Sequence, residues 1–178
     1  MTIVIDGTIG AGKTTQLDLL EKKGFSVHRE PIDQWPLEEF YNDPRRWAFY
    51  FHMVIFMTEN TQCQIHERSI LSARWVFWEI LFRKELVTHM EHNTYATYFE
   101  KFKWFPEKYI FLKKSPERAY QHIQSRGQSG DSRVSLEYLK ELDAQYETFL
   151  VTLPCEVYIV DAERSAEEIN EEIIRIIS

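Results

Sequence analysis

The sequence of 178 residues has few cysteines, no long hydrophobic run and no excess of basic side chains. Its two cysteines, Cys63 and Cys155, lie far apart and match no metal-binding or redox spacing. We therefore expect them to be small buried residues in a reducing compartment. The longest apolar run, residues 47–57, is too short to span a bilayer. The formal net charge of −7 disfavours a nucleic-acid-binding surface, which is normally basic.

Internal repeats, linkers and low-complexity tracts are also missing, so we interpret residues 1–178 as a single domain. A predicted strand begins directly after Met1, which leaves no room for a signal or transit peptide before it. We therefore expect a cytoplasmic protein that is not bound to a membrane.

Short apolar segments alternate with amphipathic helical segments along the chain. This alternation predicts an α/β fold with a mostly parallel, five-stranded sheet flanked by helices. The predicted strands are Ile3–Asp6, Phe25–Glu30, Gln62–Glu67, Lys108–Lys113 and Glu156–Asp161. Helices are predicted from Lys13 to about Lys23, after Asp43-Pro44, after Ser115-Pro116, after a capping box at Ser165, and over the helically spaced apolar residues of 47–55 and 70–81.

The most specific motif follows the first predicted strand. It is a phosphate loop, in which four residues separate Gly7 from Gly12-Lys13-Thr14. Its glycines let successive backbone N–H groups face one anion, and the helix that follows adds its positive dipole end. Lys13 would reach the β- and γ-phosphates of ATP, and Thr14 would ligate Mg²⁺. The predicted ATP-binding residues are Gly7, Thr8, Ile9, Gly10, Ala11, Gly12, Lys13, Thr14 and Thr15. A glycine turn that merely joins a strand to a helix is the alternative.

Polar side chains also stand at the ends of later predicted strands. Because strand ends face the ligand crevice in such folds, Glu30, Glu67-Arg68-Ser69 and Asp161 are candidate site residues. Glu30 could accept the proton of an attacking hydroxyl, and Glu67 could hold Mg²⁺ together with Thr14. Arg68 could contact phosphate or the acceptor oxygen. A solvated Glu30 and a surface ion pair between Glu67 and Arg68 remain open as alternatives.

Two further features have competing interpretations. Residues 126–133 combine small residues with Arg126 and Arg133, which favours a lid that closes over the triphosphate, or else a solvated loop. Several aromatic residues could line a slot for a flat base, although aromatics at helical spacing are more often core. These residues are Trp35, Tyr41, Trp47, Phe51, Phe77 and Trp78.

Together these segments resemble the deoxyribonucleoside kinase family along almost the whole chain. The resemblance rests on residues 7–15, Glu30-Pro31 with Trp35, residues 41–48, the Glu-Arg-Ser-Ile-Leu-Ser-Ala-Arg segment 67–74, and residues 115–117, 136–139, 146–147 and 160–162. It implies a P-loop NTPase-type fold that transfers the γ-phosphate of ATP to the 5′-hydroxyl of a deoxynucleoside, in nucleotide salvage. The family also implies Mg²⁺ and a homodimer.

The resemblance further implies a role for each matching side chain. Glu30 would be the base, and Arg68 would assist at the 5′-oxygen. Tyr41 and Asp131 would hold the 3′-hydroxyl, and Trp35 and Phe77 would enclose the base. With Phe51, His52 and Ala73 these complete the predicted substrate site, while Thr14 and Glu67 would lie near magnesium and Arg126 and Arg133 near ATP.

Some positions depart from the family pattern. His52 stands where members usually carry a glutamine, and an imidazole cannot reproduce an amide's side-by-side donor and acceptor. The lid region has His122, Gln124 and Gln128 where arginines are common, and Asp131 replaces a glutamate.

Ala73 matches members that accept thymidine, so we predict a pyrimidine substrate, thymidine above all, with loosened base discrimination. One alternative is a nucleoside monophosphate kinase of the thymidylate kinase type, in which Asp-Arg and an aromatic residue usually follow the third strand. The other is a kinase-like subunit without catalytic activity.

Overall fold

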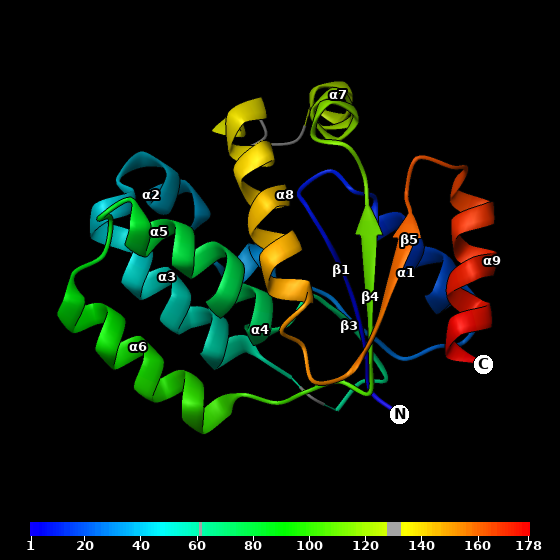
Figure 1. Cartoon of the computed structure of the whole chain (residues 1–178), viewed down its shortest axis with the longest axis horizontal. Helices are drawn as coiled ribbons and strands as arrows, with labels where there is room; N and C mark the ends of the chain where they lie inside the picture. The colour runs from blue at the N-terminus through cyan, green and yellow to red at the C-terminus, as the bar shows by residue number, and fades with distance from the viewer. Residues whose placement is uncertain (61, 128–132) are drawn as a thin grey trace.

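Five short parallel strands form the centre of the structure, a computed structural model that describes residues 1–60, 62–127 and 133–178 (Figure 1). Their order in the sheet is β2-β3-β1-β4-β5. The strands are β1 (Ile3–Gly7), β2 (Val27–His28), β3 (Ile65–Glu67), β4 (Lys108–Lys113) and β5 (Glu156–Asp161). The first strand pairs with β3 on one side and with β4 on the other. The predicted fold class, a parallel five-stranded sheet flanked by helices, is confirmed.

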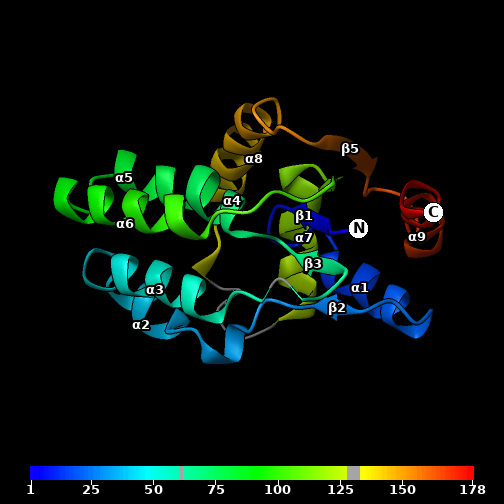
Figure 2. The same cartoon turned by 90° about the horizontal axis from the view of Figure 1, so that it is seen from below.

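Helices cover both faces of this sheet. Figure 2 shows α1 (Lys13–Lys22) and α9 (Ala166–Ile177) on one side of the strands and most of the other helices on the opposite side. The remaining helices are α2 (Leu37–Asn42), α3 (Pro44–Thr58), α4 (Ile70–Ser72), α5 (Glu79–Arg83), α6 (His89–Phe102), α7 (Pro116–Arg126) and α8 (Leu136–Leu150), with a 3₁₀ turn at Ile32–Gln34 and a π-helical segment at Ala73–Trp78.

The alternation of side chains along β1 supplies both hydrophobic cores. Ile3 and Ile5 pack in the cluster that includes residues of α1 and α9, whereas Val4 packs in the cluster on the other face. Because successive residues of a strand point to opposite faces, Asp6 shares the face of Val4. It is 0% exposed there. The strand thus delivers a buried carboxylate to the end of the sheet that leads into the phosphate loop.

Two strands are shorter than predicted. The second strand consists of Val27 and His28 alone, and the N–H of Glu30 donates to a side-chain oxygen of Glu67 at 3.4 Å. The third strand begins only at Ile65, and the N–H of Gln62 donates to the side chain of Asn60 at 3.0 Å. Side-chain acceptors therefore replace strand carbonyls at these places and end the ladder.

The predicted helix starts are confirmed, but two helical features differ from the prediction. Asp43 caps α3, Pro116 occupies the start of α7, and Ser165 forms its capping box with Glu168. The helical run over residues 70–81 contains the π-helical segment, which hydrophobic spacing does not reveal. Helices α2, α6 and α8 were not predicted; in α6 only Tyr95 and Phe99 are buried, so its apolar stripe is narrow.

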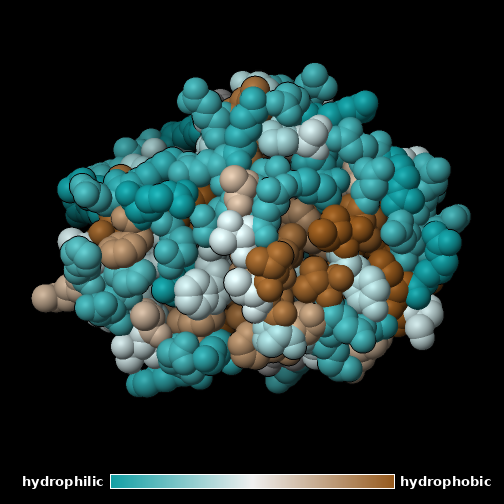
Figure 3. All heavy atoms as spheres, in the orientation of Figure 1, coloured by the Kyte–Doolittle hydropathy of each residue, from teal (hydrophilic) through white to brown (hydrophobic). Residues whose placement is uncertain are grey.

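The exposed edge of the sheet carries hydrophobic side chains. Ile159 of β5 is 63% exposed, and Figure 3 shows hydrophobic side chains gathered over this part of the face. No residue of β5 lines the ligand-sized cavity described below. None of the helices in the described ranges combines the length and hydrophobicity that a membrane span requires.

We predict that Gly10→Ala will destabilise the fold more than Gly24→Ala. Both glycines have left-handed backbones, with φ of +82° and +92°, so each alanine should cost about 1–2 kcal/mol in strain. A Cβ at Gly10 would also lie 2.7 Å from the carbonyl oxygen of Ala119, whereas a Cβ at Gly24 meets no described atom within 4 Å. The clash should cost a further ~1–3 kcal/mol in the free energy of unfolding. Urea denaturation measures the difference, and equal losses would show that α7 shifts without cost.

Candidate active site

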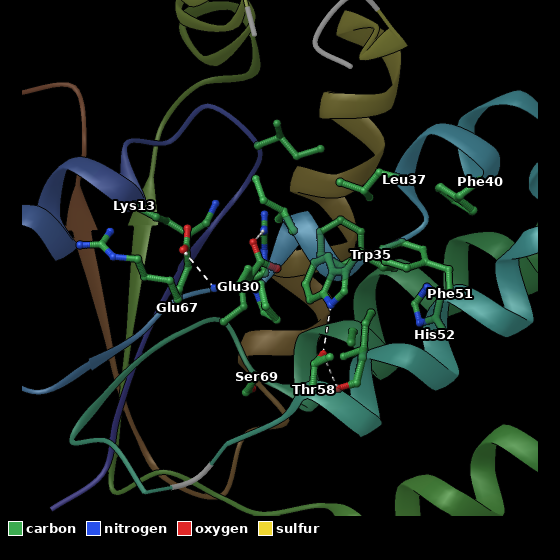
Figure 4. A pocket seen from close by; sticks show the side chains of 18 of the residues that line it. Lys13, Glu30, Trp35, Leu37, Phe40, Phe51, His52, Thr58, Glu67 and Ser69 are labelled. Atoms are coloured by element: carbon green, nitrogen blue, oxygen red, sulfur yellow. Dashed lines mark hydrogen bonds and ion pairs between the residues drawn. The ribbon is translucent and has the colours of Figure 1, made fainter. Parts of the chain in front are cut away.

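A cavity of about 460 Å³ opens beside the phosphate loop (Figure 4). Five segments form its wall: the phosphate loop with the start of α1, the stretch from β2 to α2, one side of α3 with Glu59 after it, the stretch from β3 to α5, and Val134 with Tyr138 of α8. The predicted site residues that line it are Ile9, Gly10, Lys13, Thr14, Glu30, Trp35, Tyr41, Phe51, His52, Glu67, Arg68, Ala73 and Phe77. Residues predicted for ATP, metal and substrate thus share one cavity.

Some predicted residues lie elsewhere. Gly7, Thr8, Ala11, Gly12 and Thr15 belong to the loop beside the cavity without lining it. Asp161 is exposed, outside the cavity wall, and its carboxylate accepts the N–H of Glu163 at 2.9 Å. The expectation that Asp161 faces the ligand crevice is therefore wrong, because its side chain serves the turn that follows β5.

The predicted lid is only partly visible. Arg133 donates to the carbonyl of Glu38 at 3.4 Å and lies 6.0 Å from the ring of Tyr41, so it contacts α2 rather than the phosphate loop. Asp131 and Gln128 lie outside the described residues, and so does the side chain of Arg126. The roles predicted for the lid residues remain predictions.

The phosphate loop is shaped for an anion. Gly12, with φ of +98°, is the N-cap of α1, and no side chain caps this helix within the described residues. The Lys13 ammonium donates to the carbonyls of Gly7 at 3.3 Å and Thr8 at 3.1 Å. Burial, followed by the positive charge of Arg68, lowers the pKa of Lys13 from 10.5 to about 8. A polyphosphate beside Lys13 would raise that pKa again, because an opposite charge favours the ammonium form.

Helix α7 supports this loop through a residue that departs from the family pattern. The Nδ1 atom of His122 lies 2.9 Å from the carbonyl oxygen of Gly10. The imidazole of His122 thus contacts the backbone of the phosphate loop. An arginine at this position would place a positive charge beside that loop.

Arg68 occupies the middle of the site. Its Nη1 donates to Glu30 at 2.7 Å and its Nη2 to the carbonyl of Gly7 at 3.1 Å, and its Nε lies 3.2 Å from Asp6. The side chains of Arg68 and Glu30 are only 12% and 17% exposed. The guanidinium also lies 5.0 Å from the ring centroid of Phe77. Arg68 therefore pairs with Glu30 and Asp6 inside the site, and the alternative of a surface ion pair between Glu67 and Arg68 is wrong.

Glu30 is likewise not a solvated strand-end residue. Burial raises its pKa, the Arg68 guanidinium opposes that shift, and the negative charge of Glu67 adds to it. Because a base works best when its pKa lies near the operating pH, a raised pKa suits Glu30 for accepting a proton from a neutral hydroxyl.

Aromatic rings enclose the end of the cavity formed by α3. The indole N–H of Trp35 donates to the hydroxyl of Thr58 at 3.1 Å, and the ring meets Phe51 edge-on at 5.4 Å between centroids (Figure 4). Trp78 by contrast is 0% exposed and stacks on Tyr95 at 4.1 Å. The slot interpretation therefore fits Trp35 and Phe51, and the core interpretation fits Trp78.

His52 presents a neutral imidazole to this slot. It is 2% exposed, and its ring packs 5.1 Å from Trp78 and 5.5 Å from Tyr95. Burial, with a smaller contribution from Arg74, lowers its pKa to about 3. Its Nδ1 is buried and has no hydrogen-bond partner among the described residues. The side chain nevertheless lines the cavity, where its ring can contact a ligand.

No local sequence pattern selects two other residues of this region, Glu59 and Asp6. Glu59 follows α3, lines the cavity, and accepts the indole N–H of Trp104 at 2.9 Å. Burial raises its pKa to about 7, although the bond from Trp104 opposes that shift. Asp6 lies behind Arg68. Glu59 and Asp6 both contact residues that are distant in sequence, and no local pattern predicts such contacts.

A model of the deoxynucleoside kinase family matches residues 3–178. The chain belongs to this family. The thymidine kinase of Ictalurid herpesvirus 1 is 30% identical over 204 residues, which cover 99% of this chain and 86% of the relative. The deoxyadenosine kinase of Dictyostelium discoideum is 32% identical over 164 residues, covering 83% of this chain and 66% of the relative.

A solved structure of deoxyadenosine kinase from M. mycoides, with the products dCMP and a flexible dCDP bound, superposes with a TM-score of 0.88. The two chains are 26% identical, and the match covers 99% of this kinase and 98% of the other chain. The expected family is thus confirmed, and the chain is an ATP-dependent deoxynucleoside kinase. Its relatives include kinases named for deoxyadenosine and for thymidine, so the family alone does not fix the base.

We predict that Glu59→Gln will stabilise the kinase increasingly as pH rises from about 4.5 to about 7. The raised pKa means that the folded protein disfavours the ionised carboxylate, so the wild type loses stability across this window while the amide does not. The difference in the free energy of unfolding between the variant and the wild type should approach about 3 kcal/mol and level off above pH 7. Thermal unfolding at several pH values measures it, with Glu171→Gln on the exposed side of α9 as the reference for removing a surface charge. A gap that stays constant with pH would contradict the prediction.

Proposed function

We propose that this kinase phosphorylates the 5′-hydroxyl of a pyrimidine deoxynucleoside, thymidine above all, in nucleotide salvage. The observation that supports this most directly is that the Glu30–Arg68 pair and Lys13 line the same cavity. A base and a phosphate-binding loop that open into one space can place an acceptor hydroxyl in line with a γ-phosphate.

The phosphate loop would bind ATP through residues 7–15. Its backbone N–H groups and the ammonium of Lys13 would hold the β- and γ-phosphates. Thr14 and Glu67 both line the cavity, and a hydroxyl with a carboxylate suits Mg²⁺, which usually takes few protein ligands and completes its shell with phosphate and water. The metal, when bound, neutralises charge that develops on the transferred group.

Glu30 would take the proton of the 5′-hydroxyl as its oxygen attacks the γ-phosphorus. The new O–P bond forms while the bond to the β,γ-bridging oxygen breaks, and ADP leaves. Arg68, bound to Glu30 at 2.7 Å, would remain beside the acceptor oxygen and stabilise negative charge there.

The aromatic slot would hold the base. Trp35, Phe51 and Phe77 would pack on its faces and edges, and the small side chain of Ala73 leaves the cavity wide at that point. Neutral His52 would contribute one hydrogen bond. Tyr41 in the cavity wall, together with Asp131, would hold the 3′-hydroxyl.

The proposal also covers the whole chain. Residues 1–178 would act as one domain in the cytoplasm. Residues 126–133 would form a lid, and its Arg126 and Arg133 would reach ATP when the lid closes. A homodimer is supported by exposed apolar side chains on α3 and α6, including Met57, Met90 and Phe102, which are 82%, 80% and 51% exposed. The two helices pack side by side (Figures 1 and 2).

We expect thymidine to be the best acceptor among the four deoxynucleosides and thymidine monophosphate. The measurement is transfer of radiolabel from γ-labelled ATP in the presence of Mg²⁺, with kcat/KM determined for each acceptor. Deoxycytidine should follow within about a hundredfold, because one buried hydrogen-bonding group left unpaired costs roughly 1–3 kcal/mol. A strict preference for a purine would refute the proposed substrate, and preference for the monophosphate would refute the acceptor class.

Replacement of Glu30 by glutamine should reduce kcat by roughly 10²-fold or more, because the amide keeps the shape but cannot accept the proton. Binding of ATP, measured by calorimetry, should remain. Glu171→Gln serves as the matched surface control. An unchanged kcat for Glu30→Gln would remove this residue from the role of base.

A further inference from the structure

A buried carboxylate lies behind the Arg68–Glu30 pair. Asp6 is 0% exposed, lies just before the phosphate loop, and does not line the cavity. Isolated in the interior, an ionised carboxylate is costly, so a buried one requires charged or hydrogen-bonding partners. Asp6 takes no part in the mechanism above, although the structure surrounds it with donors.

Among the described residues, the polar contacts of the Asp6 carboxylate are all with hydrogen-bond donors. It accepts the N–H of Gly7 at 2.7 Å, the hydroxyl of Tyr146 at 2.8 Å and the hydroxyl of Tyr109, and the Nε of Arg68 lies at 3.2 Å. Burial, and then the charge of Asp6, raises the pKa of both tyrosines well above the usual range, so their hydroxyls keep the protons that they donate. This donor set is that of an ionised carboxylate.

The backbone of Arg68 shows that its position is imposed by its surroundings. Its φ is +58°, in the left-handed region that is disfavoured for a non-glycine residue. Such a conformation persists only where neighbouring contacts fix it. The N–H of Arg68 donates to the carbonyl of Ile5 at 3.0 Å, and its Nε donates to the hydroxyl of Tyr146 at 3.4 Å. The strand that carries Asp6 therefore holds Arg68 at both its backbone and its side chain.

We propose that Asp6 is a positioning residue that acts through Arg68. It holds the inner edge of the guanidinium so that Nη1 reaches Glu30, and it shares the positive charge of Arg68 between two carboxylates. The proposal rests on the roles proposed above for Glu30 and Arg68. Tyr109 and Tyr146 fix Asp6 from β4 and α8.

Without the charge of Asp6, the guanidinium of Arg68 would lose the carboxylate on its inner edge, and its Nη1 would be held less firmly at 2.7 Å from Glu30.

Asp6→Asn tests this, because asparagine keeps the shape and the acceptor oxygen but loses the charge. We expect kcat to fall about tenfold or more while KM for ATP changes less than about threefold, as for an interaction made in the transition state. In an Arg68→Lys background the same substitution should have little further effect, since coupled residues are not additive.

Tyr109→Phe is the matched control for structure, because it removes one hydrogen bond to Asp6 and leaves the charge and Arg68 in place. It should lower Tm with little change in kcat. If Asp6→Asn behaves like this control, losing stability while kcat stays unchanged, Asp6 is structural and the proposal fails.

Two further measurements keep the outcome decisive. Should Asp6→Asn not fold, Tyr146→Phe removes the hydroxyl that bridges Asp6 and Arg68 while both charges remain; it should lower kcat severalfold, and an unchanged kcat would overturn the proposal. Glu30→Gln is assayed alongside. Full activity of that variant would overturn the proposed base and the role of Asp6 together, whereas its inactivity beside a fully active Asp6→Asn overturns the role of Asp6 alone.

Discussion

One buried guanidinium organises this kinase. Arg68 lies between Asp6 at 3.2 Å and Glu30 at 2.7 Å, with a side chain only 12% exposed. Removing a charge from water is expensive, and the interior repays that cost only when partners have good geometry and complete hydrogen bonding. Asp6 on β1 and Glu30 in the segment after β2 supply the two carboxylates, and the hydroxyl of Tyr146 on α8 accepts from the Nε of Arg68 at 3.4 Å. The left-handed backbone of Arg68 is held in place by these contacts.

The same contacts join the phosphate side of the cavity to the acceptor side. The carbonyl of Gly7 accepts Nη2 of Arg68 at 3.1 Å and the ammonium of Lys13 at 3.3 Å. The first residue of the phosphate loop is thus shared by the side chain proposed to hold ATP and the one proposed to assist at the acceptor oxygen. Because a polyphosphate would attract Lys13 away from its carbonyl partners, binding of ATP would leave this oxygen to Arg68.

Local sequence patterns predicted the parts of the molecule that depend on local chemistry. The phosphate loop, the capped helix starts and the carboxylates after β2 and β3 were all accessible, because turn chemistry and strand ends are written in neighbouring residues. Asp6 and Glu59 were missed because their partners are remote: Tyr109 and Tyr146 are 103 and 140 residues from Asp6, and Trp104 is 45 residues from Glu59. The role of a single carboxylate in an apolar strand, such as Asp6, cannot be predicted until it is known which strands and helices lie next to it.

Base discrimination must then depend on few side chains. The relatives of this kinase carry the names of different deoxynucleosides. The π-helical segment contributes Ala73 and Phe77 to the cavity wall, and α3 contributes His52. The neutral imidazole of His52 packs against Trp78 and Tyr95 at 2% exposure, and each of its nitrogens donates in one tautomer and accepts in the other. A single such atom can reject a base only by leaving a polar group unpaired, at a cost of about 1–3 kcal/mol. The shape of the slot must therefore supply the rest of the selectivity.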